Sequence, residues 1–420
     1  MSRSRLPKLR FPEFRDEGDW DPKSLGQVGE IVTGKTPSTS DDSLWNGDVQ
    51  FVTPTDIAEE KYQWSTQRYV ARTPTIRVIP EFSTMFTCIA SIGKMALSVK
   101  PCITNQQINT LIPQKSHNNE FVYYSLLNIV PRVKATQANS TLPIINKTEF
   151  SKFVIPIPKV FSEQQKIADC LTSIDALITA QTQKLDALKT HKKGLMQQLF
   201  PAAGETVPRL RFPEFLDAGE WETVPMGSLL VRYPEYGANA PAVPYSEDLP
   251  TYLRITDISE DGCFLSESKV SVGIAATDDN YLELGDIVLA RTGASVGKSY
   301  RYRKEDGRLV FAGFLIRIRP EPKKVNPIFL SNFLTTQQYW SWVGVTSARS
   351  GQPGINGTEY SSLPVPVPSS EVDDNELSEQ QKIADCLASL DELITAQRQK
   401  IDALKAHKKG LMQQLFPVMG

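Results

Sequence analysis

The chain has 420 residues, of which 40% are hydrophobic and 22% charged, a composition typical of a globular protein with two to four domains of about 100–200 residues each. No run of about 18 uncharged apolar residues occurs, and the basic N-terminus lacks the apolar segment of a signal peptide, so the sequence predicts a cytoplasmic protein without a membrane span. Five scattered cysteines with no CxxC pair argue against a disulfide framework and against a zinc site.

The net charge of −2 conceals segments of opposite charge. Residues 61–115 hold seven Lys or Arg and one acid, residues 291–324 hold ten Lys or Arg and three acids, and residues 233–290 hold eleven acids and two bases. Nucleic-acid-binding proteins are usually basic, so the total charge argues against that class, whereas the two basic segments favour it. Each basic segment is also compatible with an ordinary solvated surface.

The first half begins with KLRFPEF (8–14) and continues as short apolar runs separated by turn residues. Strands are predicted at residues 49–52, 85–90 and 108–112, and a short helix at residues 120–130. This mixture indicates a compact α/β (mixed α+β) domain with a mixed or antiparallel sheet.

A long helix follows this domain. Ser162 and Gln165 have the spacing of a capping box, so the helix is expected to begin at Ser162 and to end before Pro201 and Gly204. Its apolar residues recur every three to four positions, as in a coiled coil. We expect an interface at Ile167, Leu171, Ile174, Ile178, Leu185 and Leu188.

The second half repeats the first in the same order. KLRFPEF returns as RLRFPEF (209–215), and residues 162–201 match residues 378–417 at 34 of 40 positions. Between these motifs the halves match only in short islands, with strands predicted at 251–255, 286–290 and 315–318 and a helix at 327–339. A preserved scaffold with divergent inserts favours one frame that presents two recognition surfaces; neutral drift after an old duplication is the alternative.

The second long helix repeats the apolar stripe of the first. The corresponding interface positions are Ile383, Leu387, Leu390, Ile394, Ile401 and Leu404. The two helices are expected to form an antiparallel coiled coil, although each could instead pair with a separate partner subunit. The predicted domains are residues 1–158, the helix 159–204, residues 205–375 and the helix 376–420.

No segment has both the residues and the spacing of a known catalytic or metal-binding motif. TGASVGKS (292–299) has one residue too few between its glycines for a phosphate loop, so this motif and its counterpart at 91–94 are interpreted as strand–turns with a basic tip. NPIF (326–329) lacks the second proline of the amino-methyltransferase motif. The three histidines, His117, His191 and His407, are expected to be solvated, and no catalytic or metal-binding residue is predicted.

The ordered and duplicated set of motifs resembles the specificity subunit of type I restriction–modification systems. The set comprises the FPEF box, ITNQQINTLIP (103–113), GDIVLARTGASVGK (285–298), the EQQKIA-type helix start and the HKKGLMQQLFP ending. The resemblance covers nearly the whole chain. One departure is VFAGFLIRIRP (310–320), which stands where the first half has TNQQIN.

The resemblance implies a non-catalytic subunit. Each half would read one half of a bipartite site in double-stranded DNA, and the helices would dock two methyltransferase subunits. Restriction or translocase subunits would join them. S-adenosylmethionine, ATP and Mg²⁺ would be bound by those partners, with no cofactor in this chain.

Lys and Arg can neutralise phosphates, and Arg, Lys, Asn and Gln can read base edges in the major groove. Candidates in the first domain are Lys35, Arg68, Arg72, Lys94, Asn105, Gln106, Gln107, Gln137 and Asn139. Candidates in the second are Arg291, Lys298, Arg301, Arg303, Arg349 and Gln352. Two other classes stay open: a protein–protein scaffold that binds no DNA, and an enzyme such as a nuclease.

Overall fold

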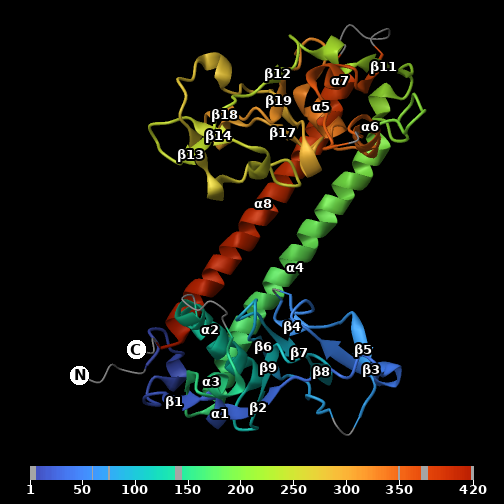
Figure 1. Ribbon diagram of the computed structural model, residues 1–420. Helices are drawn as coiled ribbons and strands as arrows, with labels where there is room; N and C mark the ends of the chain where they lie inside the picture. Colours follow the sequence, from blue (N-terminus) through green and yellow to red (C-terminus); the bar gives the residue numbers. More distant parts are fainter. Residues whose placement is uncertain are drawn as a thin grey trace. The chain divides into compact units, whose positions relative to one another are not determined.

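The computed structural model describes residues 6–58, 60–73, 76–137, 144–348, 351–369 and 377–417, and the chain divides into two units (Figure 1). Unit 1 comprises Met1–Gln183 and Arg398–Gly420, and unit 2 comprises Lys184–Gln397. Each unit therefore contains one divergent insert, the first part of the long helix that follows it and the last part of the other long helix.

Unit 1 contains a five-stranded sheet of order β2-β9-β6-β7-β4, a three-stranded sheet of order β5-β3-β8 and the pair β1-β10. Most pairs are antiparallel, but β3 with β8 and β4 with β7 are parallel, so the predicted mixed sheet is confirmed. The strands are β1 (Asp21–Ser24), β2 (Gly29–Thr33), β3 (Trp45–Val52), β4 (Tyr62–Gln63), β5 (Arg68–Val70), β6 (Thr84–Thr87), β7 (Met95–Ser98), β8 (Cys102–Thr104), β9 (Ile108–Pro113) and β10 (Val154–Ile157). The helices are α1 (Leu25–Val28), α2 (Asn119–Gln137), α3 (Lys147–Ser151) and the first part of α4 (Phe161–Leu199).

Unit 2 repeats this plan with two four-stranded sheets, of order β12-β19-β16-β17 and β13-β15-β14-β18, and the pair β11-β20. The strands are β11 (Trp221–Pro225), β12 (Glu235–Tyr236), β13 (Ala242–Pro244), β14 (Thr251–Leu253), β15 (Val270–Val272), β16 (Ile287–Ala290), β17 (Ser299–Arg301), β18 (Leu309–Phe311), β19 (Leu315–Ile318) and β20 (Pro364–Pro368). The helices are α5 (Pro327–Phe333), α6 (Gln337–Thr346), α7 (Gly357–Ser361) and the first part of α8 (Ser378–Leu415).

The six predicted strands all form, but two of them end early. β6 stops at Thr87 because Ala90 adopts a positive φ of 61°, which begins a turn. β14 stops at Leu253 because Ile255–Asp257 forms a 3-10 turn. The helix predicted at 327–339 is split into α5 and α6, because the Thr336 side chain accepts a hydrogen bond from the Tyr339 backbone and caps a new helix.

The start of each long helix is anchored to its own unit by the same contacts. The Arg10 guanidinium binds both carboxylate oxygens of Glu163 at 2.7 and 2.8 Å, and Arg211 binds Glu379 at 2.8 and 2.7 Å. α4 begins at Phe161 rather than at Ser162. Gln165 bonds Asn118 and Asp169 instead of closing the predicted capping box. The near-identical helix starts thus preserve one anchoring set in both units.

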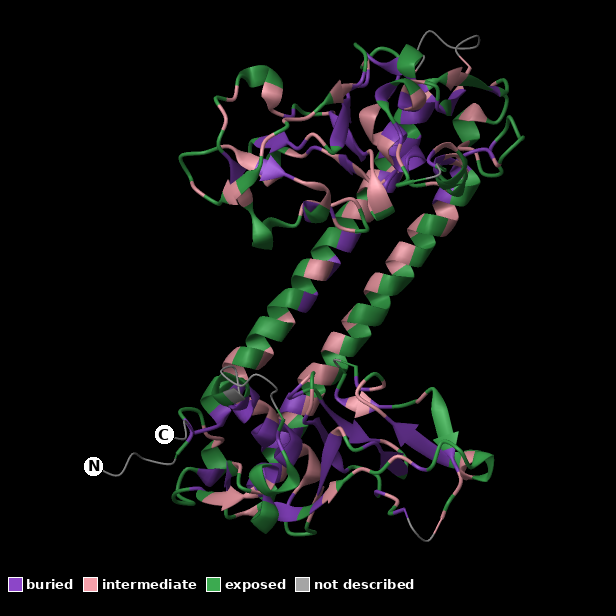
Figure 2. Ribbon diagram, viewed as in Figure 1, coloured by how far each residue is buried: buried purple, intermediate pink, exposed green. Residues whose placement is uncertain are grey.

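The end of each long helix completes a hydrophobic core. In unit 1, Phe416 at the end of α8 packs edge-on against Trp20, with ring centroids 6.2 Å apart. In unit 2, Phe200 at the end of α4 packs in the same way against Trp221 at 6.2 Å. Buried residues gather in these cores, whereas the middle stretches of both helices are mostly exposed or half-buried (Figure 2).

The twelve predicted interface residues divide into two groups. Ile167, Leu171, Ile383 and Leu387 are almost fully buried in the cores of their own units, so their side chains are already covered within this chain. Ile394 and Ile401 are 7% and 6% exposed. The half-buried remainder is Ile174, Ile178, Leu185, Leu188, Leu390 and Leu404.

Within unit 1, α4 and α8 lie antiparallel. Asp175, in the first half of α4, pairs with Lys408 near the end of α8 at 2.6 Å. The predicted fold class is confirmed: two pseudo-repeated mixed α+β domains and two long antiparallel helices.

Candidate nucleic-acid interface

Three segments meet at one end of the five-stranded sheet in unit 1. The Cys88 backbone donates to the Gln107 carbonyl at 2.9 Å, and the Lys35 backbone donates to the Thr104 carbonyl at 2.8 Å. β2 and β6 end here and β9 begins here, which brings residues 33–36, 88–94 and 104–107 together. We call these residues edge 1.

Edge 1 holds five of the predicted site residues. Lys35, Lys94 and Gln106 are exposed. The Asn105 amide donates to the Gln107 side chain at 3.1 Å, and Thr36 donates to the Gln106 side chain at 2.6 Å. These bonds hold two glutamine amides in place, as a site that reads base edges by hydrogen bonds requires.

The other candidates of unit 1 lie elsewhere or are not described. Arg68, on β5, stacks its guanidinium 3.7 Å from the centre of the Trp45 ring, and Arg72 pairs with Asp48 at 3.6 Å. Arg68 is therefore on the three-stranded sheet, and Arg72 lies just after strand β5 of that sheet, so neither belongs to edge 1. Asn139 lies outside the described residues, and of Gln137 only the backbone, at the end of α2, is described.

Unit 2 builds the same edge with the same backbone hydrogen bonds. The Arg291 backbone donates to the Phe314 carbonyl at 3.1 Å, and the Ala238 backbone donates to the Phe311 carbonyl at 2.8 Å. In both units a glycine–lysine turn is closed alike: the Gly93 backbone bonds the Thr87 carbonyl, and the Gly297 backbone bonds the Ala290 carbonyl. We call residues 236–238, 291–298 and 311–314 edge 2.

The equivalent bonds establish which side chains occupy the same place in the two edges. Lysine is kept at only one position, the glycine–lysine turn, and the other positions differ in chemistry. The pairs are Lys35 with Ala238, Cys88 with Arg291, Lys94 with Lys298, Asn105 with Ala312, Gln106 with Gly313, and Gln107 with Phe314.

The glycine of each turn is required by its surroundings. Gly93 and Gly297 have φ angles of +84° and +88°. A Cβ on Gly93 would lie 2.8 Å from Val130, and one on Gly297 would lie 2.7 Å from Val343. The predicted strand–turn is confirmed at both places, and its lysine is exposed in unit 1 at Lys94, whereas in unit 2 Lys298 is mostly covered.

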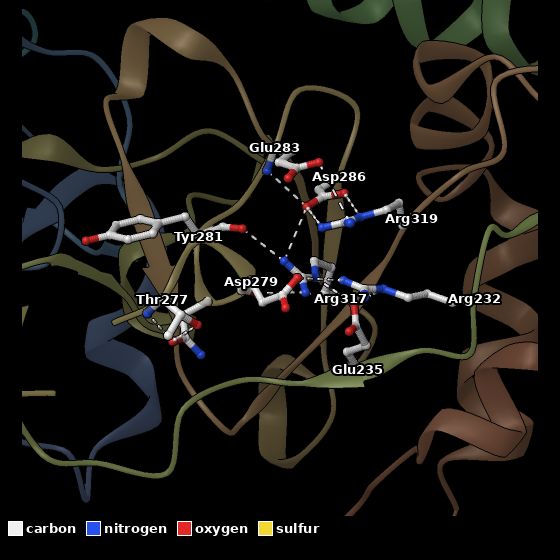
Figure 3. Close-up of polar contacts among 10 residues, drawn as sticks. Arg232, Glu235, Thr277, Asp279, Tyr281, Glu283, Asp286, Arg317 and Arg319 are labelled. Atoms are coloured by element: carbon white, nitrogen blue, oxygen red, sulfur yellow. Dashed lines mark hydrogen bonds and ion pairs between the residues drawn. The ribbon is translucent and has the colours of Figure 1, made fainter. Parts of the chain in front are cut away.

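The basic segment of unit 2 is largely neutralised inside the unit. Arg317, 2% exposed, binds Glu235 at 2.8 Å and lies 3.6 Å from Asp286, and Arg319 binds Asp286 at 3.1 Å (Figure 3). These acids belong to the acidic segment 233–290. The prediction that the basic segment is available to phosphates is therefore wrong for these residues, because opposite charges of neighbouring segments pair.

Two further candidates of unit 2 make contacts inside the unit, and a third, Arg301, is half-buried. Lys298 pairs with Glu260 at 2.6 Å and has a side chain only 15% exposed. Arg303 donates to the Cys263 sulfur at 3.6 Å. Burial lowers the pKa of the half-buried Arg301, with the nearby Arg303 acting in the same direction and Asp391 opposing it.

One further candidate belongs to edge 2, a second lies beside it, and a third is not described. The Arg291 guanidinium carbon lies 4.8 Å from the centre of the Tyr236 ring. Gln352 is exposed, with its amide nitrogen 3.1 Å from where a Cβ on Gly293 would stand. Arg349 lies outside the described residues.

Sequence reasoning missed Phe314 and Tyr236 because aromatic residues were not considered as contacts. Aligning β9 with β19 would have placed Phe314 opposite Gln107. The expectation of solvated histidines is wrong for His117, which is 6% exposed. In the described ranges, no group of three His, Cys, Asp or Glu is arranged to hold a metal ion, and no helix is both long and apolar enough to cross a membrane.

Comparison with known proteins agrees with the duplicated architecture. Residues 17–190 and 243–406 match the type I restriction modification DNA specificity domain. The chain belongs to this family. The first matched segment contains all of edge 1, and the second contains edge 2 except residues 236–238, so most of the duplicated site lies within the family domain.

Two specificity subunits from Methanocaldococcus jannaschii illustrate the relationship. The MjaIX subunit is 29% identical over 236 residues, 53% of this chain and 54% of that protein, so the match spans about half of that relative's length. The MjaVIII subunit is 22% identical over 97% of this chain and 93% of its own. The crystal structure of an S subunit from M. genitalium shares the fold, with a TM-score of 0.59 at 14% identity, covering 99% of this chain and all of that one.

Proposed function

We propose that this chain is the DNA-reading subunit of a type I restriction–modification complex and performs no chemistry itself. Unit 1 reads one half of a bipartite duplex site and unit 2 reads the other. The observation that carries the proposal is the pair of edges, which have the same backbone hydrogen bonds and different side chains. Two edges with the same backbone and different side chains suit the recognition of two different DNA sequences by one duplicated fold.

In edge 1 the readers are Lys35, Lys94, Gln106 and Gln107, and the buried Asn105 positions Gln107 through two hydrogen bonds. In unit 2 the readers are Arg291 on edge 2 and Gln352 beside it. Amide groups suit adenine and guanidinium groups suit guanine in the major groove. Arg68 and Arg72, on the second sheet of unit 1, contact phosphates, which position the duplex without specifying its sequence. Lys298, which pairs with Glu260, holds the glycine–lysine turn of edge 2. Arg301 and Arg303 follow the edge 2 residues 291–298 along the chain, and we assign them no contact with DNA.

The partners that we propose are those that the family resemblance implies. Two methyltransferase subunits dock on the two helices, and restriction or translocase subunits complete the complex. S-adenosylmethionine, ATP and Mg²⁺ are bound by those partners. Exposed Leu177 on α4 and Leu393 on α8, which are equivalent in the repeat, support two equivalent docking surfaces.

The test is duplex binding by the chain co-purified with its methyltransferase subunit. We expect binding to a duplex that contains the modified motif to exceed binding to a scrambled duplex, and to weaken steeply with salt as phosphate contacts release counterions. Absence of any duplex binding would favour a protein–protein scaffold. Cleavage of DNA by the purified chain with Mg²⁺ alone would favour a nuclease.

A further inference from the structure

We propose that edge 2 recognises the 5-methyl group of a thymine through Phe314, a contact that edge 1 does not make. The inference rests on the proposed function and deepens it by naming a base feature and a residue that reads it.

Phe314 is presented outwards by a fixed turn. Phe314 is 63% exposed and lies at the connection between β18 and β19. The Gly313 backbone donates to the Ala238 carbonyl at 2.8 Å, and the Leu315 backbone donates to the Ala312 carbonyl at 2.8 Å. Both neighbours of Phe314 are thus held, and its ring is the part of the turn that projects.

The repeat places this ring at a reading position. The Phe314 carbonyl accepts from the Arg291 backbone as the Gln107 carbonyl accepts from Cys88. Gln107 offers an amide that can bond base edges, whereas Phe314 offers only apolar surface. A hydrogen-bond reader in one unit is therefore replaced by an apolar reader in the other.

The chemistry of duplex DNA limits what an apolar reader can detect. The thymine methyl is the apolar group that the major groove displays, and it distinguishes thymine from cytosine. Arg291 lies beside Phe314, and its guanidinium donates to the Gly313 carbonyl at 3.4 Å. This bond ties the charged reader of edge 2 to the turn that carries the ring.

The experiment uses the complex with its methyltransferase subunit. The motif is first identified from modified bases in cells, and each thymine of the half-site read by unit 2 is then replaced by uracil, which lacks only the methyl group. We expect one replacement to weaken binding about fourfold, corresponding to about 0.8 kcal/mol for one buried carbon group. Phe314→Ala should weaken binding of the thymine duplex and bind the thymine and uracil duplexes equally.

Leu284→Ala is the matched control. Leu284 is also 63% exposed in unit 2 but precedes β16, at the end opposite Arg291. This variant should keep the full difference between thymine and uracil.

Several results would overturn the inference while the proposed function stands. They are a half-site without thymine on either strand, equal binding of every uracil duplex by the unsubstituted complex, and a Phe314→Ala complex that keeps the methyl dependence. Weaker binding by Phe314→Ala without any methyl dependence in the parent would indicate a ring inserted between base pairs instead. Failure of the parent complex to prefer its motif over a scrambled duplex would overturn the proposed function as well.

Discussion

Asp175 forms an ion pair with Lys408 at 2.6 Å in unit 1, and the equivalent Asp391 forms one with Lys192 at 2.7 Å in unit 2. The side chain of Asp175 is 19% exposed and that of Asp391 is 40% exposed. Asp175 also accepts a 2.5 Å hydrogen bond from Tyr124. The same helix–helix contact is thus set in two different environments.

The difference in environment predicts different costs for the same substitution. Asp175→Asn should lower the free energy of unfolding by about 2 kcal/mol, because it weakens two charge-assisted bonds at a poorly exposed site. Asp391→Asn should cost less, about 1 kcal/mol, because the Asp391 carboxylate is more exposed, although it also faces the half-buried Arg301 and Arg303. Urea unfolding of the two variants measures the difference, and equal losses would contradict the role assigned to burial.

The anchoring pair at the helix start predicts a larger loss. Arg10 and Glu163 have side chains 8% and 1% exposed. Glu163→Gln should destabilise the protein by about 3–5 kcal/mol, because the guanidinium loses its buried counter-charge. Glu379→Gln should act alike in unit 2. The exposed pair Glu13–Lys166 provides the control, and Glu13→Gln should cost no more than about 1 kcal/mol in the same urea titration.

Glycine-to-alanine substitutions should destabilise the protein in the two glycine–lysine turns and stabilise it within α4. Gly93→Ala and Gly297→Ala should each destabilise by more than about 1 kcal/mol, because a Cβ meets a valine and φ is positive. Gly194→Ala, within α4 with no atom near the new Cβ, should stabilise by about 0.5–1 kcal/mol. Thermal unfolding compares the three variants. A stabilising Gly93→Ala would show that the turn is not constrained as described.

Much of the fold was predictable because periodicity and repetition are local signals. The strand at 315–318 matches β19, and the long helix expected from Ser162 begins at Phe161. The pairing of Arg317 with Glu235 and Asp286 was not predictable, since it joins segments that only tertiary structure brings together. For the same reason charge counts misjudged which cations are available to DNA. The correspondence of Gln107 and Phe314 required the backbone hydrogen bonds of both units.

His117 should make unit 1 sensitive to acid. Burial lowers its pKa below the ordinary 6.5, with the nearby Lys23 contributing. Between these two pKa values His117 is protonated in the unfolded chain and neutral in the folded chain. The free energy of unfolding should therefore fall as the pH drops from about 6.5 to the folded pKa, by at most about 1.4 kcal/mol per pH unit. Urea unfolding at pH 7.5 and 5.5 should show this loss in the parent and a smaller one in His117→Gln. An unchanged loss in the variant would assign the effect to other groups.

The most direct test of two independent readers is the modified DNA motif in cells that express edge variants with the partner subunits. The double variant Gln106→Ala, Gln107→Ala should relax the half-site read by unit 1 and leave the other half intact. Arg291→Ala should do the reverse, since it lies on edge 2. Sequencing of modified bases across the genome gives both motifs directly. A variant that alters both half-sites, or leaves both unchanged while modification continues, would contradict the account.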